Sequence, residues 1–131
     1  MFFEISDLIA AVSIIVTMGT FLAQHIRTIR VETIHQLNEL FDYYYTELQG
    51  KTVNTNYLDF VKYMSRLDRF AVAVNEGIYC KGMVKKRASI LLTKQYDEFM
   101  KGIITQRRAQ FHRENYYENI EKLIKSFGNK Y

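Results

Sequence analysis

The chain contains no proline, a single cysteine and only six glycines among its 131 residues. Proline and glycine are the main residues that break regular structure, so their scarcity favours long helices. The lone cysteine, Cys80, excludes a disulfide within the chain and a CxxC metal site. No Ser/Gly-rich linker, low-complexity tract or internal repeat separates the chain into modules. These absences predict one small domain of uninterrupted helices.

A run of nineteen uncharged residues, Leu8 to Ile26, lies close to the N-terminus. As a helix it rises ~28 Å, about the thickness of the hydrocarbon core of a bilayer. Arg27 and Arg30 follow the run directly, whereas residues 1–7 contain no Lys or Arg. Because basic residues are retained on the cytoplasmic side, we predict an extracytoplasmic head (1–7), a transmembrane helix (8–26) and a cytoplasmic domain (27–131).

Two other interpretations of this run stay open. A cleaved secretory signal has a basic head before its apolar run, whereas here Glu4 and Asp7 make the head acidic. An ordinary buried helix of a soluble protein also has such a composition. Small residues four apart, such as Gly19 and Ala23, allow two membrane helices to approach each other closely.

Apolar residues recur at steps of three and four through the rest of the chain, which is the spacing of one helical face. The first helix is expected to run from about Ile5 to Gln49, with Gly50 as its stop. Asn54 and Thr55 are candidate N-caps for the second helix. The four stripes are Ile34, Leu37, Phe41, Tyr44 and Leu48; Tyr57, Phe60, Met64, Leu67, Ala71, Val74 and Ile78; Val84, Ala88, Leu92, Tyr96, Phe99 and Ile103; and Tyr116, Ile120, Leu123 and Phe127.

The predicted fold class is all-α, because β-branched runs fall inside helical periods and no Asn-Gly hairpin turn occurs. We expect a transmembrane helix continuous with a cytoplasmic helix, followed by a small helical bundle, about four helices in total. A polar joint over residues 106–113 separates the last two helices. The stripe on the first helix needs a cover, either the bundle or a second copy, and we expect a homo-oligomer through the first two helices.

Positive charge is concentrated between Lys81 and Arg113, where nine Lys and Arg residues face only Asp97 and Glu98. The members of this basic band that we single out are Lys81, Lys85, Lys86, Arg87, Arg107, Arg108 and Arg113. Such a band suits a membrane surface or another polyanion, and a solvated helix face has the same composition. Both interpretations stay open.

The sequence contains no glycine-rich phosphate loop, GxSxG elbow or HExxH motif. Its three histidines lie far apart, so we expect neither a metal nor a cofactor. Arg107 and His112 have the spacing found in HEPN-type ribonucleases, in which cations hold the scissile phosphate and the imidazole moves a proton. Arg108 stands where those enzymes carry Asn, Asp or His, and Arg30 with His35 repeats the spacing beside the membrane. We therefore expect no enzymatic activity and no nucleic-acid partner.

Three stretches together resemble a known family. They are the N-terminal span ending at Arg27, the sequence LDRFAVAVNEGI over residues 67–78, and Arg107 followed by YYENIEKL over residues 116–123. They resemble a bacterial family of short membrane-anchored helical proteins, domain of unknown function 4760, and this implies a bacterial or phage source. The matched positions, which the resemblance implies are structural, are Phe70, Ala71, Asn75, Gly77, Ile78, Arg107, Tyr116, Tyr117 and Leu123. Gly77 is expected to end the second helix, with Ile78 folding back onto it.

The sequence therefore favours a non-enzymatic single-pass protein of the bacterial inner membrane. Its cytoplasmic helical domain would serve interaction or signalling, as a stress- or phage-related accessory, with the lipid bilayer, a second copy and a protein as its partners. One alternative is a membrane-tethered effector, either a ribonuclease centred on Arg107 and His112 or a protein that perturbs membranes. The other is a soluble helical binding module.

Overall fold

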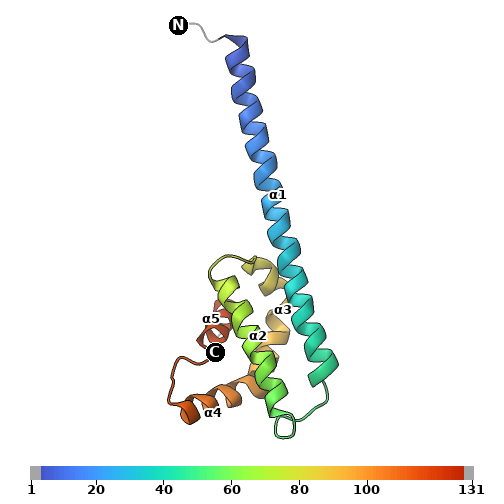
Figure 1. The fold of residues 1–131 in the computed structure, drawn as a ribbon, viewed down its shortest axis with the longest axis vertical. Helices are drawn as coiled ribbons and strands as arrows, with labels where there is room; N and C mark the ends of the chain where they lie inside the picture. The colour runs from blue at the N-terminus through green and yellow to red at the C-terminus, as the bar shows by residue number, and fades with distance from the viewer. Residues whose placement is uncertain (1–3, 129–131) are drawn as a thin grey trace.

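The computed structural model describes residues 4–128 as helices joined by short connections. A long rod, α1 (Ile5–Tyr43), stands out of a helical bundle and ends in a wide π-turn, η1 (Tyr44–Leu48) (Figure 1). The bundle is completed by α2 (Tyr57–Asn75), α3 (Lys81–Gln95), a second π-turn η2 (Tyr96–Met100), α4 (Lys101–Phe111) and α5 (Glu118–Ser126). Counting each unbroken run once, these residues form four helical segments, which confirms the predicted all-α class.

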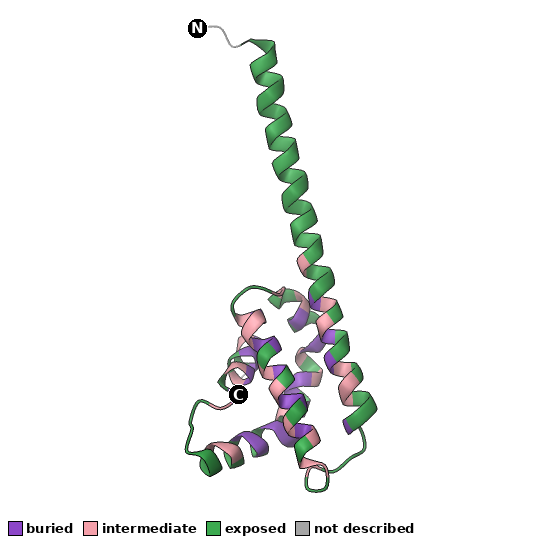
Figure 2. Ribbon diagram, viewed as in Figure 1, coloured by how far each residue is buried: buried purple, intermediate pink, exposed green. Residues whose placement is uncertain are grey.

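The first part of α1 contacts no other element of the described chain (Figure 2). Every residue from Glu4 to Thr28 is exposed, including large apolar side chains such as Phe21, which is 67% exposed. Burial begins with Ile29 and continues along one face to Leu40. The apolar run and the packed stripe are thus consecutive parts of one helix, as predicted, and the stripe is covered by the chain's own bundle.

The predicted stripes supply most of the core. In the second stripe, Phe60, Met64, Leu67, Ala71 and Val74 are all buried. In the third, Val84, Ala88, Leu92, Phe99 and Ile103 are buried. The side chains at these positions face inward because successive steps of three and four keep them on one side of a helix.

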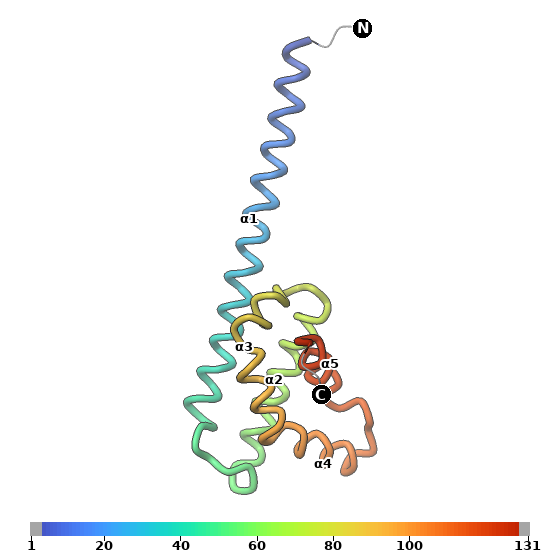
Figure 3. Tube along the Cα trace, turned by 180° about the vertical axis from the view of Figure 1, so that it is seen from behind, coloured from blue at the N-terminus to red at the C-terminus, as the bar shows by residue number. Residues whose placement is uncertain are grey.

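The two π-turns were not predicted. A π-turn adds one residue to a helical turn, so the face that follows it is rotated. At the end of the first helix the turn is closed by a hydrogen bond from the Gln49 N–H to the Tyr44 carbonyl at 2.9 Å. The helix predicted over the third stripe is instead divided by η2 into α3 and α4, and α4 turns away from α3 at this point (Figure 3).

The ends of α2 correct two expectations. The N-cap position is Asn56, and neither Asn54 nor Thr55 takes that place. At the other end, Gly77 has a φ of 81° and its N–H donates to the Val74 carbonyl at 3.1 Å. The Ile78 N–H donates to the Ala73 carbonyl at 2.8 Å, which completes a Schellman stop. The Ile78 side chain, however, is 57% exposed and lies beyond the helix, so its predicted place in the stripe is wrong.

The joint before the last helix lies further along the chain than predicted. Helix α4 continues to Phe111, and the connection comprises residues 112–117. His112 ends α4 in the left-handed conformation, with a φ of 52°, and Tyr117 precedes α5 with a φ of 59°. Tyr116 and Tyr117 therefore belong to the connection, although Tyr117 is still buried in the core.

Candidate membrane-proximal basic site

The start of α3 is attached to α1 through one fully buried hydroxyl, that of Thr33. Its Oγ1 donates to the Ile29 carbonyl at 2.7 Å and accepts from the Cys80 N–H at 2.9 Å. The corner that precedes α3 is therefore held at a defined height on α1. Sequence analysis missed Thr33, because a hydroxyl beside an apolar stripe commonly bonds only to its own helix.

This attachment brings together cations that are distant in the sequence. A hollow of about 510 Å³ between α1 and α3 is lined by Arg30, Lys86 and Arg87, together with Cys80, Gly82 and Met83. Among residues 4–128, none of these three cations forms an ion pair with a carboxylate. Lys81 and Lys85 are exposed on the same half of α3. The start of α3 lies beside α1 where α1 leaves the bundle (Figure 1).

The basic band predicted as one unit is divided in two. Lys81, Lys85, Lys86 and Arg87 lie on the first half of α3, whereas Arg107 and Arg108 lie at the end of α4 and Arg113 just beyond it. Because η2 redirects α4, the two groups occupy different parts of the bundle (Figure 3). Lys86 and Arg87 of the first group line a hollow together with Arg30 of α1.

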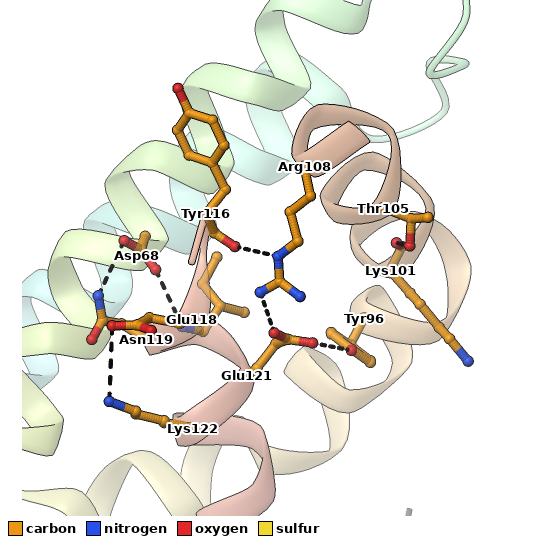
Figure 4. Close-up of polar contacts among 11 residues, drawn as sticks. Asp68, Tyr96, Lys101, Thr105, Arg108, Tyr116, Glu118, Asn119, Glu121 and Lys122 are labelled. Atoms are coloured by element: carbon orange, nitrogen blue, oxygen red, sulfur yellow. Dashed lines mark hydrogen bonds and ion pairs between the residues drawn. The ribbon is translucent and has the colours of Figure 1, made fainter. Parts of the chain in front are cut away.

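Arg108 has a structural role rather than a place on a basic surface (Figure 4). Its guanidinium pairs with Glu121 of α5, and its Nε donates to the Tyr116 carbonyl at 3.0 Å. The Tyr96 hydroxyl donates to the other oxygen of Glu121 at 3.0 Å. Burial raises the pKa of Tyr96, and this hydrogen bond and the charge of Glu121 raise it further. Arg108 and Tyr96 thereby fasten α5 to the third helical segment.

Asp68 and Asn75 of α2 hold the first turn of α5 from the other side, and Figure 4 shows the contacts of Asp68. The Asp68 carboxylate accepts from the Ile120 N–H at 3.2 Å and from Asn119 Nδ2 at 3.4 Å. Asn75 Nδ2 donates to the Asn119 carbonyl at 3.1 Å. The family-like positions Phe70, Ala71, Tyr117 and Leu123 are buried in the core. Asp68 was not singled out in the sequence.

His112 does not line the hollow that Arg107 borders. The Arg107 guanidinium lies over the rings of Phe111 and Tyr116, with centroid distances of 5.0 and 5.7 Å. Its Nε is buried and has no hydrogen-bond partner among the described residues. It borders a hollow of about 340 Å³ together with Ser65, Asp68, Arg69, Tyr116 and Tyr117. His112 is exposed at the end of α4 and is not among the lining residues.

The remaining candidates for chemistry are dispersed. His25 and His35 both lie on α1, away from His112. Across residues 4–128, no three His, Cys, Asp or Glu side chains come together in a way that could hold a metal ion. Cys80 is a free, partly buried thiol at the N-cap of α3.

The apolar part of α1 is long enough and apolar enough for a membrane span or a signal sequence. A core helix of a soluble protein passes the same test of length and composition, but such a helix is mostly buried. Here the apolar window is 0% buried. The span Leu8–Ile26 and its flanking Arg27 and Arg30 all lie on this single helix.

Comparison with known proteins identifies one family. No curated protein matches the chain, and no solved structure matches it. A family model described as a domain of unknown function, DUF4760, matches residues 7–127. The match extends from the beginning of the apolar run to the end of the bundle, so it includes both the exposed helix and the domain that packs against it. The chain belongs to the DUF4760 family.

Proposed function

We propose that this protein is a single-pass membrane protein whose helical bundle is a cytoplasmic interaction or signalling domain. The observation that carries the proposal is the division of α1 into an exposed apolar half and a packed half. Soluble monomers rarely expose a continuous apolar surface as long as the run from Leu8 to Ile26. Each large apolar side chain gains about 1.5–3 kcal/mol on leaving water, so a bilayer is the environment that suits these residues.

The charge flanking the span supports the orientation. Arg27 and Arg30 lie on the bundle side of the apolar run, and residues 4–7 carry only the acidic Glu4 and Asp7 as charged side chains. Basic residues are retained in the cytoplasm. The bundle therefore belongs in the cytoplasm and the N-terminus outside, in the inner membrane of a bacterium.

The proposed role of the domain is to bind a partner rather than to catalyse a reaction. Family-like positions such as Asn75, Tyr117 and Leu123 are used in packing α5 against the rest of the bundle. Leu37, Leu40 and Leu48 of the first helix are buried within one chain. A second copy would therefore meet this protein along the free half of α1, where Gly19 and Ala23 permit close approach. A protein partner would use the exposed faces of the bundle.

Membrane extraction tests the anchor. The full-length protein is expected to stay in the membrane pellet through carbonate and high-salt washes and to keep its full-length mass. Ile15→Lys puts a charge in the middle of the span, where it costs about 2.5–3.5 kcal/mol, so extraction is expected to increase. Ile90→Lys, at an exposed position on α3, is the matched control and is expected to behave as the wild type.

Protease added to spheroplasts tests the orientation. A C-terminal tag is expected to be protected until the membrane is broken. Release of intact wild-type protein by carbonate contradicts the span, a shortened membrane-free product indicates a cleaved signal, and loss of the tag in intact spheroplasts reverses the orientation.

A further inference from the structure

We propose that the hollow between α1 and the start of α3 is a phosphate-binding site, occupied by the phosphate of an acidic lipid headgroup. The choice of a lipid as the source rests on the proposed membrane function. The inference that the ligand is a phosphate rests on the residues of the hollow, which Arg30, Lys86 and Arg87 line from two different helices.

The charge in this hollow is uncompensated. Among the described residues, Arg30, Lys86 and Arg87 have no carboxylate partner. Two other hollows in the bundle differ in this respect: the one between α1 and α2 has Glu39 beside its arginines, and the one at Arg107 has Asp68. Cations held around one cavity repel one another, and an anion that enters removes this repulsion. Guanidinium groups also bind two phosphate oxygens at once.

The backbone of α3 adds to this positive field. The first N–H groups of a helix have no partner within the helix, and they form the positive end of its dipole. In α3 the first turn contains no acidic residue, and the N-cap residue Cys80 makes no side-chain cap within the described structure. Gly82 lies in this turn and lines the hollow. A Cβ atom at Gly82 would meet no atom within 4 Å, so the backbone there is open to a ligand.

The position of the hollow along α1 corresponds to the layer of lipid headgroups. Arg30 follows Ile26, the last residue of the apolar run, by four positions. At ~1.5 Å per residue this places Arg30 ~6 Å beyond the hydrocarbon core. The polar layer on each side of a bilayer is roughly 5–7 Å thick. Lys86 and Arg87 meet Arg30 in the same hollow, because Thr33 fixes the start of α3 at this height.

Lipid binding to the purified full-length protein in neutral detergent tests the proposal. Native mass spectrometry is used to titrate dioleoyl phosphatidylglycerol and, separately, dioleoyl phosphatidylcholine. One molecule of phosphatidylglycerol is expected to bind at least tenfold more tightly than phosphatidylcholine. The triple variant Arg30→Gln, Lys86→Gln, Arg87→Gln is expected to lose this preference. The charge-matched variant Lys51→Gln, Lys62→Gln, Lys101→Gln, with its changes at exposed positions outside the hollow, is expected to keep it.

A second pair of variants separates a built site from diffuse charge. Gly82→Leu fills the hollow without removing a charge and is expected to weaken phosphatidylglycerol binding at least tenfold. Gly102→Leu makes the same change at the second residue of α4, also in open space, and is expected to bind as the wild type. Helical content, measured by circular dichroism, is expected to be equal in all variants. Equal binding of the two lipids, or a preference that survives both the triple variant and Gly82→Leu, overturns the proposal.

Inorganic phosphate, added at constant ionic strength, distinguishes the two sources of the ligand. No displacement of phosphatidylglycerol by millimolar phosphate supports the lipid headgroup. Complete displacement overturns the assignment to a lipid and shows that the hollow binds phosphate from solution. Because these measurements are made in detergent, they are independent of membrane extraction, so failure of the site and failure of the anchor are distinguishable.

Discussion

Replacing Asp68 by alanine removes the acceptor that closes the first turn of α5. Asp68 lies on α2, and its carboxylate accepts from the Ile120 N–H at 3.2 Å and from Asn119 Nδ2 at 3.4 Å. The residue at the N-cap of α5, Tyr117, makes no side-chain cap in the described structure. With nine residues, α5 is too short to be stable as an isolated helix. It therefore depends on a cap that another helix provides.

The cost of Asp68→Ala follows from two contributions. Loss of an N-cap acceptor costs about 0.5–2 kcal/mol. Loss of a negative charge at a helix N-terminus adds about 0.3–1 kcal/mol. Since Asp68 is half-buried, solvent screens these contributions only in part, and we expect a loss of about 2 kcal/mol in the free energy of unfolding. Asp68→Asn keeps an oxygen acceptor but not the charge, so only the second contribution, up to about 1 kcal/mol, is expected to be lost.

Urea unfolding of the full-length protein in neutral detergent measures this difference. Near-ultraviolet circular dichroism of the tyrosines reports on the bundle, and the midpoint is expected to fall without a change in slope. Asp42→Ala removes an exposed carboxylate of α1 that makes no hydrogen bond within residues 4–128, and it is the matched control. A wild-type midpoint for Asp68→Ala, or an equal loss of stability in Asp42→Ala, contradicts the role of Asp68 as the cap of α5.

Three further predictions concern the core, pH and catalysis. Leu67→Asp is expected to lower the free energy of unfolding by several kcal/mol because it puts a charge into the core, whereas Tyr44→Phe should change it little. An unchanged melting temperature for Leu67→Asp contradicts the packing of α2. Burial raises the pKa of Tyr63 well above 10, so the unfolded chain ionises first. The contribution of Tyr63 to stability should be constant below pH 10 and fall above it, by up to ~1.4 kcal/mol per pH unit. Urea midpoints should therefore fall less steeply with pH in Tyr63→Phe than in the wild type; equal slopes between about pH 9 and 11.5 contradict this. Total RNA should stay intact with the wild type, and cleavage that both Arg107→Ala and His112→Ala abolish would contradict our proposal of a non-enzymatic protein.

The core positions were predictable because helical packing depends on a short-range period. Residues such as Met64, Leu67 and Val74 are three or four positions apart, and this spacing alone places them on one face. The stop at Gly77 was predictable for a similar reason, since glycine takes a positive φ at low cost. By contrast, the turns η1 and η2 have no local sequence signature. An added residue in a helical turn is unfavourable unless tertiary packing offsets its free-energy cost.

The second π-turn, η2, also divides the expected basic band between two parts of the bundle. Counted along the sequence, Arg87 and Arg107 belong to one continuous helix. The bend at η2 separates them, whereas the fold brings Arg87 to Arg30, which is distant in the chain. A count of charges along the sequence does not say on which surface of the fold each charged residue lies. That depends on the path of the backbone.

The apolar run, the helical segments and the inward-facing stripes follow from the amino-acid sequence alone, since each depends on residues within a few turns of one another. The contacts that join these helices depend on the tertiary packing. The Thr33 hydroxyl meets the Cys80 N–H, and the Asp68 carboxylate caps α5, across separations of 47 and 52 residues. Such contacts depend on where whole helices pack, and their polar partners leave no periodic pattern in the chain. The basic hollow at Arg30 exists for the same reason: the packing of α3 on α1 creates it.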